Sequence, residues 1–221
     1  MLLIGWDVGI KNLSYCVVEY NDNNYVIRDW NIIDLRYDNE ETKEISDSKS
    51  KAKTKEITKT KTKAKEKKCS KISLKDLSRN LYKKLEENNS FSNFDYVIIE
   101  NQPVLKNPTM KSIQMILYSY FSFKSLGIEN FKDLLLMNAS NKLKVYKGDI
   151  DSEELEKINK LKSKYSRNKK LSILHSQLIL ETHSTETWLE FFNSNKKKDD
   201  LADAFLMCMY FGIKNKYINN F

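Results

Sequence analysis

The residue that most constrains the fold of this chain is an aspartate inside an apolar segment. Residues 2–8 are apolar except for a glycine and Asp7, which predicts a central strand buried on both faces. An unpaired ionised carboxylate there costs several kcal/mol, so a cation or a hydrogen-bond network normally compensates for it. Glu100 likewise closes the apolar run 96–99, and Asp200 and Asp203 stand at the head of an apolar helix. Acids at the ends of separate buried elements predict a site for a hard divalent metal.

Four converging carboxylates need positive charge between them. Asp200 and Asp203 are three residues apart and share one helix face. With Asp7 and Glu100 they would repel one another and raise one another's pKa, and two Mg²⁺ ions would relieve that repulsion. Such a pair of ions, ~4 Å apart, activates a water on one side of a phosphodiester and stabilises the leaving oxygen on the other. Three of the four acids also have a structural interpretation: a turn cap for Asp7, a lysine pair for Glu100, and a first-turn acid for Asp200, beside a helix cap at Asp199. Asp203, one turn further into the helix and flanked by apolar residues, is harder to explain in this way.

Most of the positive charge lies in one tract. The chain carries a net charge of +8, but residues 41–71 hold twelve Lys against five Asp or Glu, which is +7. The remainder carries +1, so basic character alone does not predict nucleic-acid binding by the folded body. The tract has no apolar face to bury, which predicts a disordered insertion. It fits a solvated loop or an electrostatic tether for phosphate backbones, and these two interpretations are compatible.

Composition predicts one domain over residues 1–221. A hydrophobic fraction of 40% supports a packed core, and no apolar stretch approaches the ~20 residues of a membrane span. The first residues lack the basic segment and cleavage site of a signal peptide, so we expect an intracellular protein that is not secreted and has no membrane partner. Three unpaired cysteines favour reduced thiols over a zinc site.

The pattern of elements predicts a mixed α/β sheet. Strand-like runs cover residues 2–7, 13–20, 25–34, 96–100 and 133–138, and a turn at 21–24 predicts a hairpin. Helices are expected at 73–87, from 108, around 171–179 and from 199, whereas 142–164 is ambiguous between loop and exposed helix. This order predicts a five-stranded sheet, antiparallel at one side, with helices on both faces. The first strand can then lie beside the fourth, which would place Asp7 next to Glu100.

Three segments resemble the acidic motifs of RuvC-type Holliday junction resolvases, above all the branch found in poxviruses, other large DNA viruses and fungal mitochondria. They are Gly5-Trp-Asp-Val-Gly-Ile-Lys-Asn12, Ile99-Glu-Asn-Gln-Pro-Val-Leu-Lys-Asn107 and Lys198-Asp-Asp-Leu-Ala-Asp-Ala204. The resemblance implies an RNase H-like fold and a homodimer. It also implies a crossover-junction endodeoxyribonuclease that uses Mg²⁺ or Mn²⁺ to nick two strands of a four-way DNA junction symmetrically.

The resemblance also assigns roles to the four acids. Asp7 would be the first-strand acid that bridges both ions, Glu100 would hold one ion, and Asp200 with Asp203 would hold the other. Water would be the nucleophile, with no covalent enzyme intermediate. If the chain is viral, it would act in the replication compartment of the host cell.

Polar residues near the acids are candidates for contacts with DNA, although the lysines also fit a solvated surface. They are Lys11, Gln102, Lys106, Asn107, Lys111, Lys142 and Lys144. Phosphate contacts of this kind give affinity with a steep salt dependence and little sequence information.

Three alternatives stay open. The first is a nuclease of the same fold that acts on RNA–DNA hybrids or flaps, since a fold does not fix a substrate. The second is an actin-like ATPase or sugar kinase, which the scarcity of downstream glycines disfavours. The third is a non-catalytic DNA-binding or scaffold protein that uses the lysine tract.

Overall fold

A computed structural model gives the structure of residues 1–37, 72–105, 107–183 and 186–221. The predicted lysine-rich insertion at 41–71 lies outside the described residues, as does Lys106.

The described strands form one five-stranded sheet in the order β3-β2-β1-β4-β5. The strands are β1 (Leu2–Asp7), β2 (Leu13–Asn21), β3 (Asn24–Ile33), β4 (Tyr96–Glu100) and β5 (Asp133–Met137). The pairs β1–β2 and β2–β3 are antiparallel, whereas β1–β4 and β4–β5 are parallel. The predicted mixed sheet is therefore confirmed, with the first strand beside the fourth.

The hairpin between β2 and β3 turns on two residues in the left-handed region. Asp22 has a φ of 47° and Asn23 a φ of 61°, between the paired residues Asn21 and Asn24. Asn and Asp tolerate this conformation, and two-residue turns of this kind match the twist of the flanking strands. The predicted hairpin is confirmed.

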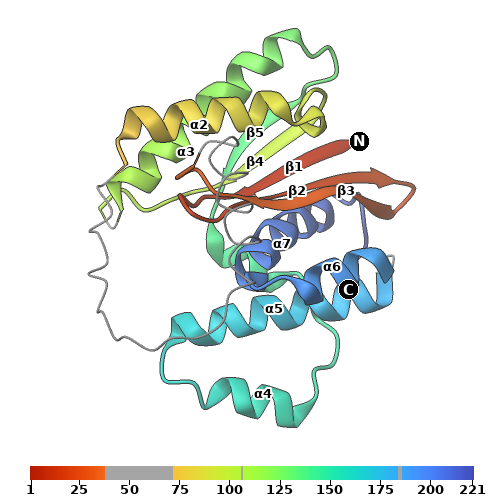
Figure 1. The fold of residues 1–221 in the computed structure, drawn as a ribbon. Coiled ribbons are helices and arrows are strands. Elements are labelled where there is room, and N and C mark those ends of the chain that lie inside the picture. The colour runs from red at the N-terminus through yellow and green to blue at the C-terminus, as the bar shows by residue number, and fades with distance from the viewer. Residues whose placement is uncertain (38–71, 106, 184–185) are drawn as a thin grey trace, which may run out of the picture.

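Helices cover both faces of the sheet (Figure 1). One face carries α2 (Leu74–Glu87) and α3 (Pro108–Lys124). The other carries α5 (Lys164–His183), α6 (Glu186–Ser194) and α7 (Lys198–Lys214), with α4 (Ser152–Asn159) outermost. Each face has its own core, one around Trp6 and the other around Trp30. Trp6 and Trp30 are both almost fully buried.

Two helices of the described structure go beyond the definite predictions: α6 was not predicted, and α4 is an exposed helix in a segment that the sequence left open between loop and exposed helix. Within the ambiguous segment 142–164, it has the end of a 3₁₀ helix, η3 (Ala139–Lys144), and then α4. In α4 only Ile158 is buried, so the helix lacks the apolar repeat by which a sequence pattern is recognised. Helix α6 spans nine residues, too few for a strong periodic signal.

Helix α7 crosses β1 at very short range. A Cβ on Gly5 would lie 2.5 Å from Sγ of Cys208 and 3.1 Å from the carbonyl oxygen of Ala204. A side chain at position 5 would therefore push the helix away from the strand. Because Ala204 follows Asp203, this close contact also sets how near the helix acids come to the end of β1.

Candidate active site

The ends of β1 and β4 turn their acids toward α7. Trp6 lies opposite Ile99 in the parallel pair, and both belong to the core beneath α2 and α3. Successive residues of a strand face opposite sides, so the next residues, Asp7 and Glu100, face the α7 side. This register confirms the prediction that Asp7 and Glu100 lie next to each other.

Two buried side chains of the sheet anchor the first turn of α7. The hydroxyl of Ser14 donates a hydrogen bond of 2.6 Å to the carbonyl oxygen of Asp200. The indole Nε1 of Trp30 donates one of 3.1 Å to the carbonyl oxygen of Leu201. Both donors are almost completely buried, so water does not compete strongly for these carbonyls. The sheet thus fixes the helix end from which Asp200 and Asp203 project.

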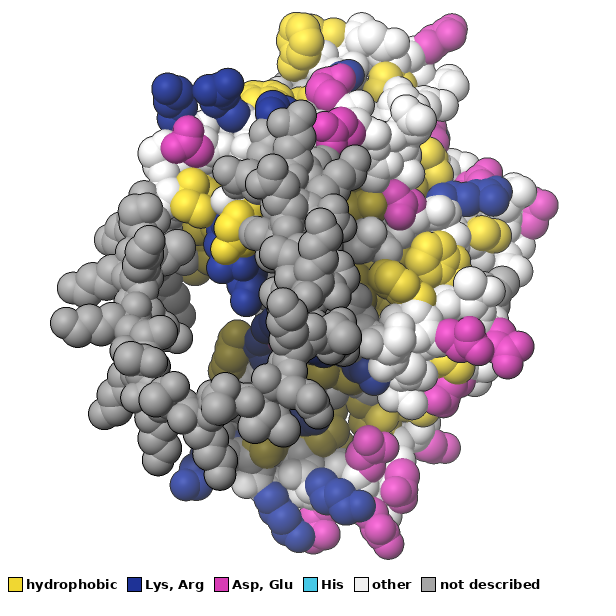
Figure 2. All heavy atoms as spheres, in the orientation of Figure 1, with side chains coloured by type: hydrophobic (Ala, Val, Ile, Leu, Met, Phe, Trp, Pro, Cys, Tyr) yellow, Lys and Arg dark blue, Asp and Glu magenta, His cyan; other side chains and the backbone are white. Residues whose placement is uncertain are grey.

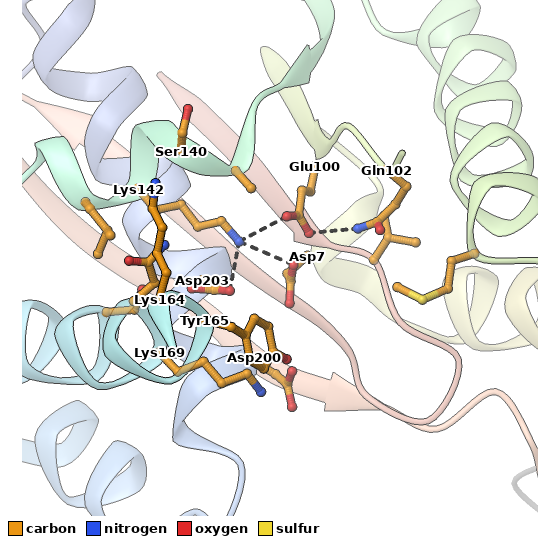
Figure 3. Close-up of a pocket in the computed structure, with 16 residues that line it drawn as sticks. Asp7, Glu100, Gln102, Ser140, Lys142, Lys164, Tyr165, Lys169, Asp200 and Asp203 are labelled. Carbon is orange, nitrogen blue, oxygen red and sulfur yellow. Dashed lines mark hydrogen bonds and ion pairs between the residues drawn. The ribbon is translucent and has the colours of Figure 1, made fainter. Parts of the chain in front are cut away.

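A lysine joins three of the four acids. The ammonium Nζ of Lys142, on η3, lies 3.5 Å from Oδ1 of Asp7, 3.3 Å from Oε1 of Glu100 and 2.8 Å from Oδ2 of Asp203 (Figure 3). Lys142 is only 3% exposed, so the solvated interpretation of this lysine is wrong. An ammonium buried among carboxylates remains charged because their negative charge outweighs its loss of hydration.

The pKa values follow this arrangement of charges. Burial raises the pKa of Asp7 well above its usual range, and the charges of Glu100 and Asp203 raise it further, against the opposing effect of Lys142. Burial also raises the pKa of Asp203. Burial alone would raise the pKa of Glu100, but hydrogen bonds with Asp7 and Lys142 and the lysine charge lower it. The cluster therefore lacks positive charge: one ammonium faces three acids.

Asp200 lies at the edge of this cluster and has no partner of its own. Its Oδ2 is buried without a hydrogen-bond partner among the described residues. Burial and the neighbouring charge of Asp199 raise its pKa to about 6. Asp199 instead forms an ion pair with Lys169 of α5. Of the two adjacent aspartates, Asp200 is thus the one whose carboxylate forms no direct ion pair with a described residue, although the charges of Lys169 and Lys197 act on it from a distance.

All four acids line one pocket of about 480 Å³. Its floor is formed by the ends of β1, β4 and α7, and its opposite wall is formed by the N-terminal half of α5. Figure 3 shows Lys164, Tyr165 and Lys169 of this wall facing the acids. The wall residues are Lys164, Tyr165, Asn168, Lys169 and Ser172.

The predicted polar contacts divide into two groups. Gln102 lines the pocket and donates a 2.8 Å hydrogen bond from Nε2 to Oε2 of Glu100. Asn107 caps α3 by accepting from the backbone N–H of Met110. The remaining described candidates lie away from the pocket lining: Lys11, Lys111 and Lys144. Lys111 donates to Asn101 and Gln114, and Lys144 donates to Asn141.

The sequence interpretation missed the α5 wall. Residues 165, 168, 169 and 172 follow helical spacing, but they are polar or aromatic, and only the apolar residues of this helix entered the prediction. These polar and aromatic residues recur at helical spacing along α5, as its buried apolar residues do, and this repeat could have identified the wall from the sequence. The burial of Lys142 had no comparable signal.

Comparison with known proteins adds a second line of evidence. Residues 3–104 match the family model described as mitochondrial resolvase Ydc2 / RNA splicing MRS1. The crystal structure of the fowlpox virus Holliday junction resolvase matches with a TM-score of 0.55 at 16% identity, over 97% of this chain and 99% of that one. The chain has the resolvase fold. The predicted resemblance to these nucleases is therefore confirmed.

A second fowlpox resolvase structure, in complex with its substrate Holliday junction DNA, matches this resolvase-like chain with a TM-score of 0.52. Its identity is 21%, over 95% of this chain and 97% of that one. At such identities the likeness concerns the fold. An uncharacterised protein of Acanthamoeba polyphaga mimivirus is 38% identical over 143 residues. This match covers 61% of the chain but only 34% of the viral protein, so the chain matches about a third of that relative's length.

The resolvase fold implies a divalent metal, and the donor set fits one. As they stand, no three Asp, Glu, His or Cys side chains of the described residues form a ready metal site. Lys142 lies where three of the carboxylates converge, so a cation already belongs at this point. The buried, unpartnered Oδ2 of Asp200 supplies a further oxygen. Hard carboxylate oxygens are the ligands that Mg²⁺ and Mn²⁺ prefer.

None of the described helices of this resolvase-like chain is both long and apolar enough to cross a membrane.

Proposed function

We propose that this chain is a metal-dependent endonuclease that resolves four-way DNA junctions by paired, symmetric nicks. The observation that carries this proposal is the convergence of acids from β1, β4 and α7 on one pocket. A cluster of carboxylates that lacks positive charge fits phosphodiester hydrolysis assisted by metal ions better than it fits a binding surface for polyanionic DNA.

The four acids would hold two Mg²⁺ ions, for which Mn²⁺ can substitute. When bound, such ions activate a water and stabilise the leaving oxygen of the phosphodiester. Asp7 and Glu100 belong to the rigid centre of the sheet, and Asp203 is fixed by the anchored end of α7. The chain thus provides a preorganised set of oxygens rather than one assembled from loops.

Lys142 has two roles in this proposal. Without metal it neutralises part of the repulsion among Asp7, Glu100 and Asp203. Its long side chain can move its ammonium toward a phosphate at the pocket mouth, where negative charge develops during strand cleavage. A positive group in this place stabilises that charge.

Polar and basic residues outside the cluster would position the DNA through its phosphates. Gln102 lies at the pocket, and four described candidates lie outside its lining: Lys11, Asn107, Lys111 and Lys144. Lys106, which is not among the described residues, stays a candidate from the sequence. Figure 2 shows Lys and Arg side chains at the upper left of this face, within a central hollow, along its lower edge and in one place on the right, whereas Asp and Glu lie mostly on the right half. This asymmetry favours approach of a phosphate backbone from the basic side.

The working unit would be a homodimer, because paired cuts in a two-fold junction require two active sites in matching symmetry. The outer side of α3 and the turn after it expose apolar side chains suited to a contact between copies: Met115, Phe123 and Leu126. A nuclease for recombining DNA would act inside the cell. If the chain is viral, as its relative in Acanthamoeba polyphaga mimivirus suggests, it would act in the replication compartment of the host cell.

A cleavage assay tests the proposal directly. A four-way junction, an RNA–DNA hybrid and a flap are each incubated with the full chain and Mg²⁺, and both product strands of the junction are mapped. We expect junction cleavage at symmetric positions, and a dimer by light scattering. Cleavage of the hybrid or the flap by a monomer would instead establish the alternative nuclease. Binding without cleavage in Mg²⁺ and in Mn²⁺ would leave a DNA-binding protein.

A further inference from the structure

Tyr165 is a large aromatic side chain on the pocket wall that the packing of the fold leaves exposed. Tyr165, in the first turn of α5, is 69% exposed although it lines the same pocket as the four acids. No other aromatic ring of the described residues packs against it (the aromatic pairs lie elsewhere in the two cores and on α2 and α3). Burying an aromatic ring is favourable, so a ring left in water at a pocket mouth is available for a ligand.

The ring is held in place from one side only. The ammonium Nζ of Lys169, one turn further along α5, lies 4.9 Å from the ring centroid. Lys169 is itself fixed by its ion pair with Asp199. A cation at one face orients the ring and leaves the other face free. Figure 3 shows this ring on the side of the pocket where Asp200 lies.

We propose that Tyr165 stacks on a nucleobase next to the phosphate that is cut. This inference rests on the proposed function, since it concerns the DNA strand that enters the same pocket. Every base offers a π face, so stacking holds a strand without reading its sequence. Nucleotides at a branch point lose a stacking neighbour, and an aromatic ring beside the acids replaces it. The pocket volume of about 480 Å³ lies within the range of sites that enclose small ligands.

The charges around the ring agree with a nucleotide rather than an isolated base. Lys164 is exposed beside Tyr165 and also lines the pocket, so a phosphate attached to a stacked base would meet an ammonium group that none of the described residues pairs with. The same wall contributes the amide of Asn168 and the hydroxyl of Ser172. The combination of aromatic, amide and basic groups along one helix face is typical of sites that bind single-stranded nucleic acid.

Fluorescence of 2-aminopurine tests the stacking directly. The probe is placed, one position at a time, next to the branch point of a junction and in a matching single strand, in EDTA so that no strand is cut. We expect the full chain to quench the probe at one or more positions. Tyr165→Phe retains this quenching. Tyr165→Leu, which keeps apolar cover for Lys169 but has no π face, loses it and binds both DNAs roughly tenfold more weakly.

Tyr82→Leu is the matched control. Tyr82 is a partly exposed tyrosine on α2, outside the pocket lining, so this variant should quench and bind like the wild type. Equal quenching by Tyr165→Leu and wild type, or no quenching by wild type at any position, would overturn the stacking proposal.

Junction cleavage in Mg²⁺, measured in parallel, separates this proposal from the proposed function. If the junction stays uncut while quenching depends on Tyr165, the nuclease proposal fails and the stacking proposal stands. If the junction is cut while quenching does not depend on Tyr165, the reverse holds.

Discussion

The ammonium group of Lys142 lies 2.8 Å from Oδ2 of Asp203, and the lysine is buried. The two residues come from η3 and α7. The same ammonium group also contacts Asp7 and Glu100, so it joins acids from three elements. A lysine in this position neutralises part of the repulsion among the three carboxylates in the absence of metal.

Replacing Lys142 by Met should destabilise the metal-free protein by about 3 kcal/mol at neutral pH, because three carboxylates lose their counter-charge. The free energy of unfolding in urea, measured in EDTA, gives this loss. Mg²⁺ should restore more stability to the variant than to the wild type, since the ion replaces the lost charge. Lys144→Met is the control, as Lys144 is exposed. Equal losses with and without Mg²⁺ would contradict the counter-charge role.

Lys142→Met should also change how stability depends on pH. Without the lysine charge, the folded-state pKa values of Asp7 and Asp203, already raised by burial, rise further. A group with a raised folded-state pKa binds its proton more tightly in the folded state, so its stabilising effect is present at low pH and lost as pH rises. The difference in free energy of unfolding between wild type and Lys142→Met should therefore shrink as pH falls from 8 to 5.

Asp7→Asn should reduce junction cleavage at least about a hundredfold, because an amide oxygen cannot carry the charge that holds a divalent ion. Junction binding should persist, since phosphate contacts come from other residues. Cleavage time courses and binding titrations in EDTA measure the two effects. Glu153→Gln, on the exposed surface of α4, is the control. Retained cleavage by Asp7→Asn would refute the role assigned to this residue.

Ser14→Ala should lower stability by about 1 kcal/mol and lower the cleavage rate, because the carbonyl oxygen of Asp200 loses its buried donor. Ser78→Ala is a matched control: Ser78 also donates a 2.6 Å hydrogen bond to a helix carbonyl oxygen, that of Leu74, but on the exposed face of α2. It should leave cleavage unchanged. A slower rate for both variants, or for neither, would argue against anchoring of α7 as the cause.

His175 should make the fold sensitive to acid. This histidine of α5 is buried against Tyr146, its Nδ1 has no hydrogen-bond partner among the described residues, and burial lowers its pKa. A histidine with a lowered folded-state pKa takes up its proton in the unfolded state first, so stability falls as pH drops below about 6.5. His175→Leu should remove up to about 1.4 kcal/mol of this loss per pH unit. Urea unfolding from pH 7.5 to 5.5 compares the two proteins, and parallel curves would exclude His175.

Local patterns were enough to predict the sheet and the principal acids. The apolar run around Asp7, the run that Glu100 closes and the spacing of Asp200 and Asp203 are all visible within short segments of the chain. Burying a carboxylate costs free energy in any fold, so an acid within an apolar run already indicates a functional site. Helix α6 was missed and α4 was left open between loop and exposed helix, because a short or mostly exposed helix shows little apolar periodicity.

Local patterns in the chain predicted the strands, the hairpin and the neighbourhood of Asp7 and Glu100, because alternation and spacing are visible within short segments. Long-range packing was needed to show that Lys142 is buried among these acids, that Asp199 pairs with Lys169 while Asp200 does not, and that Tyr165 lies on the opposite wall of the pocket. Surface lysines and tyrosines look alike in a sequence. Their burial depends on which distant elements pack together, and the close approach of α7 to Gly5 is one part of that packing.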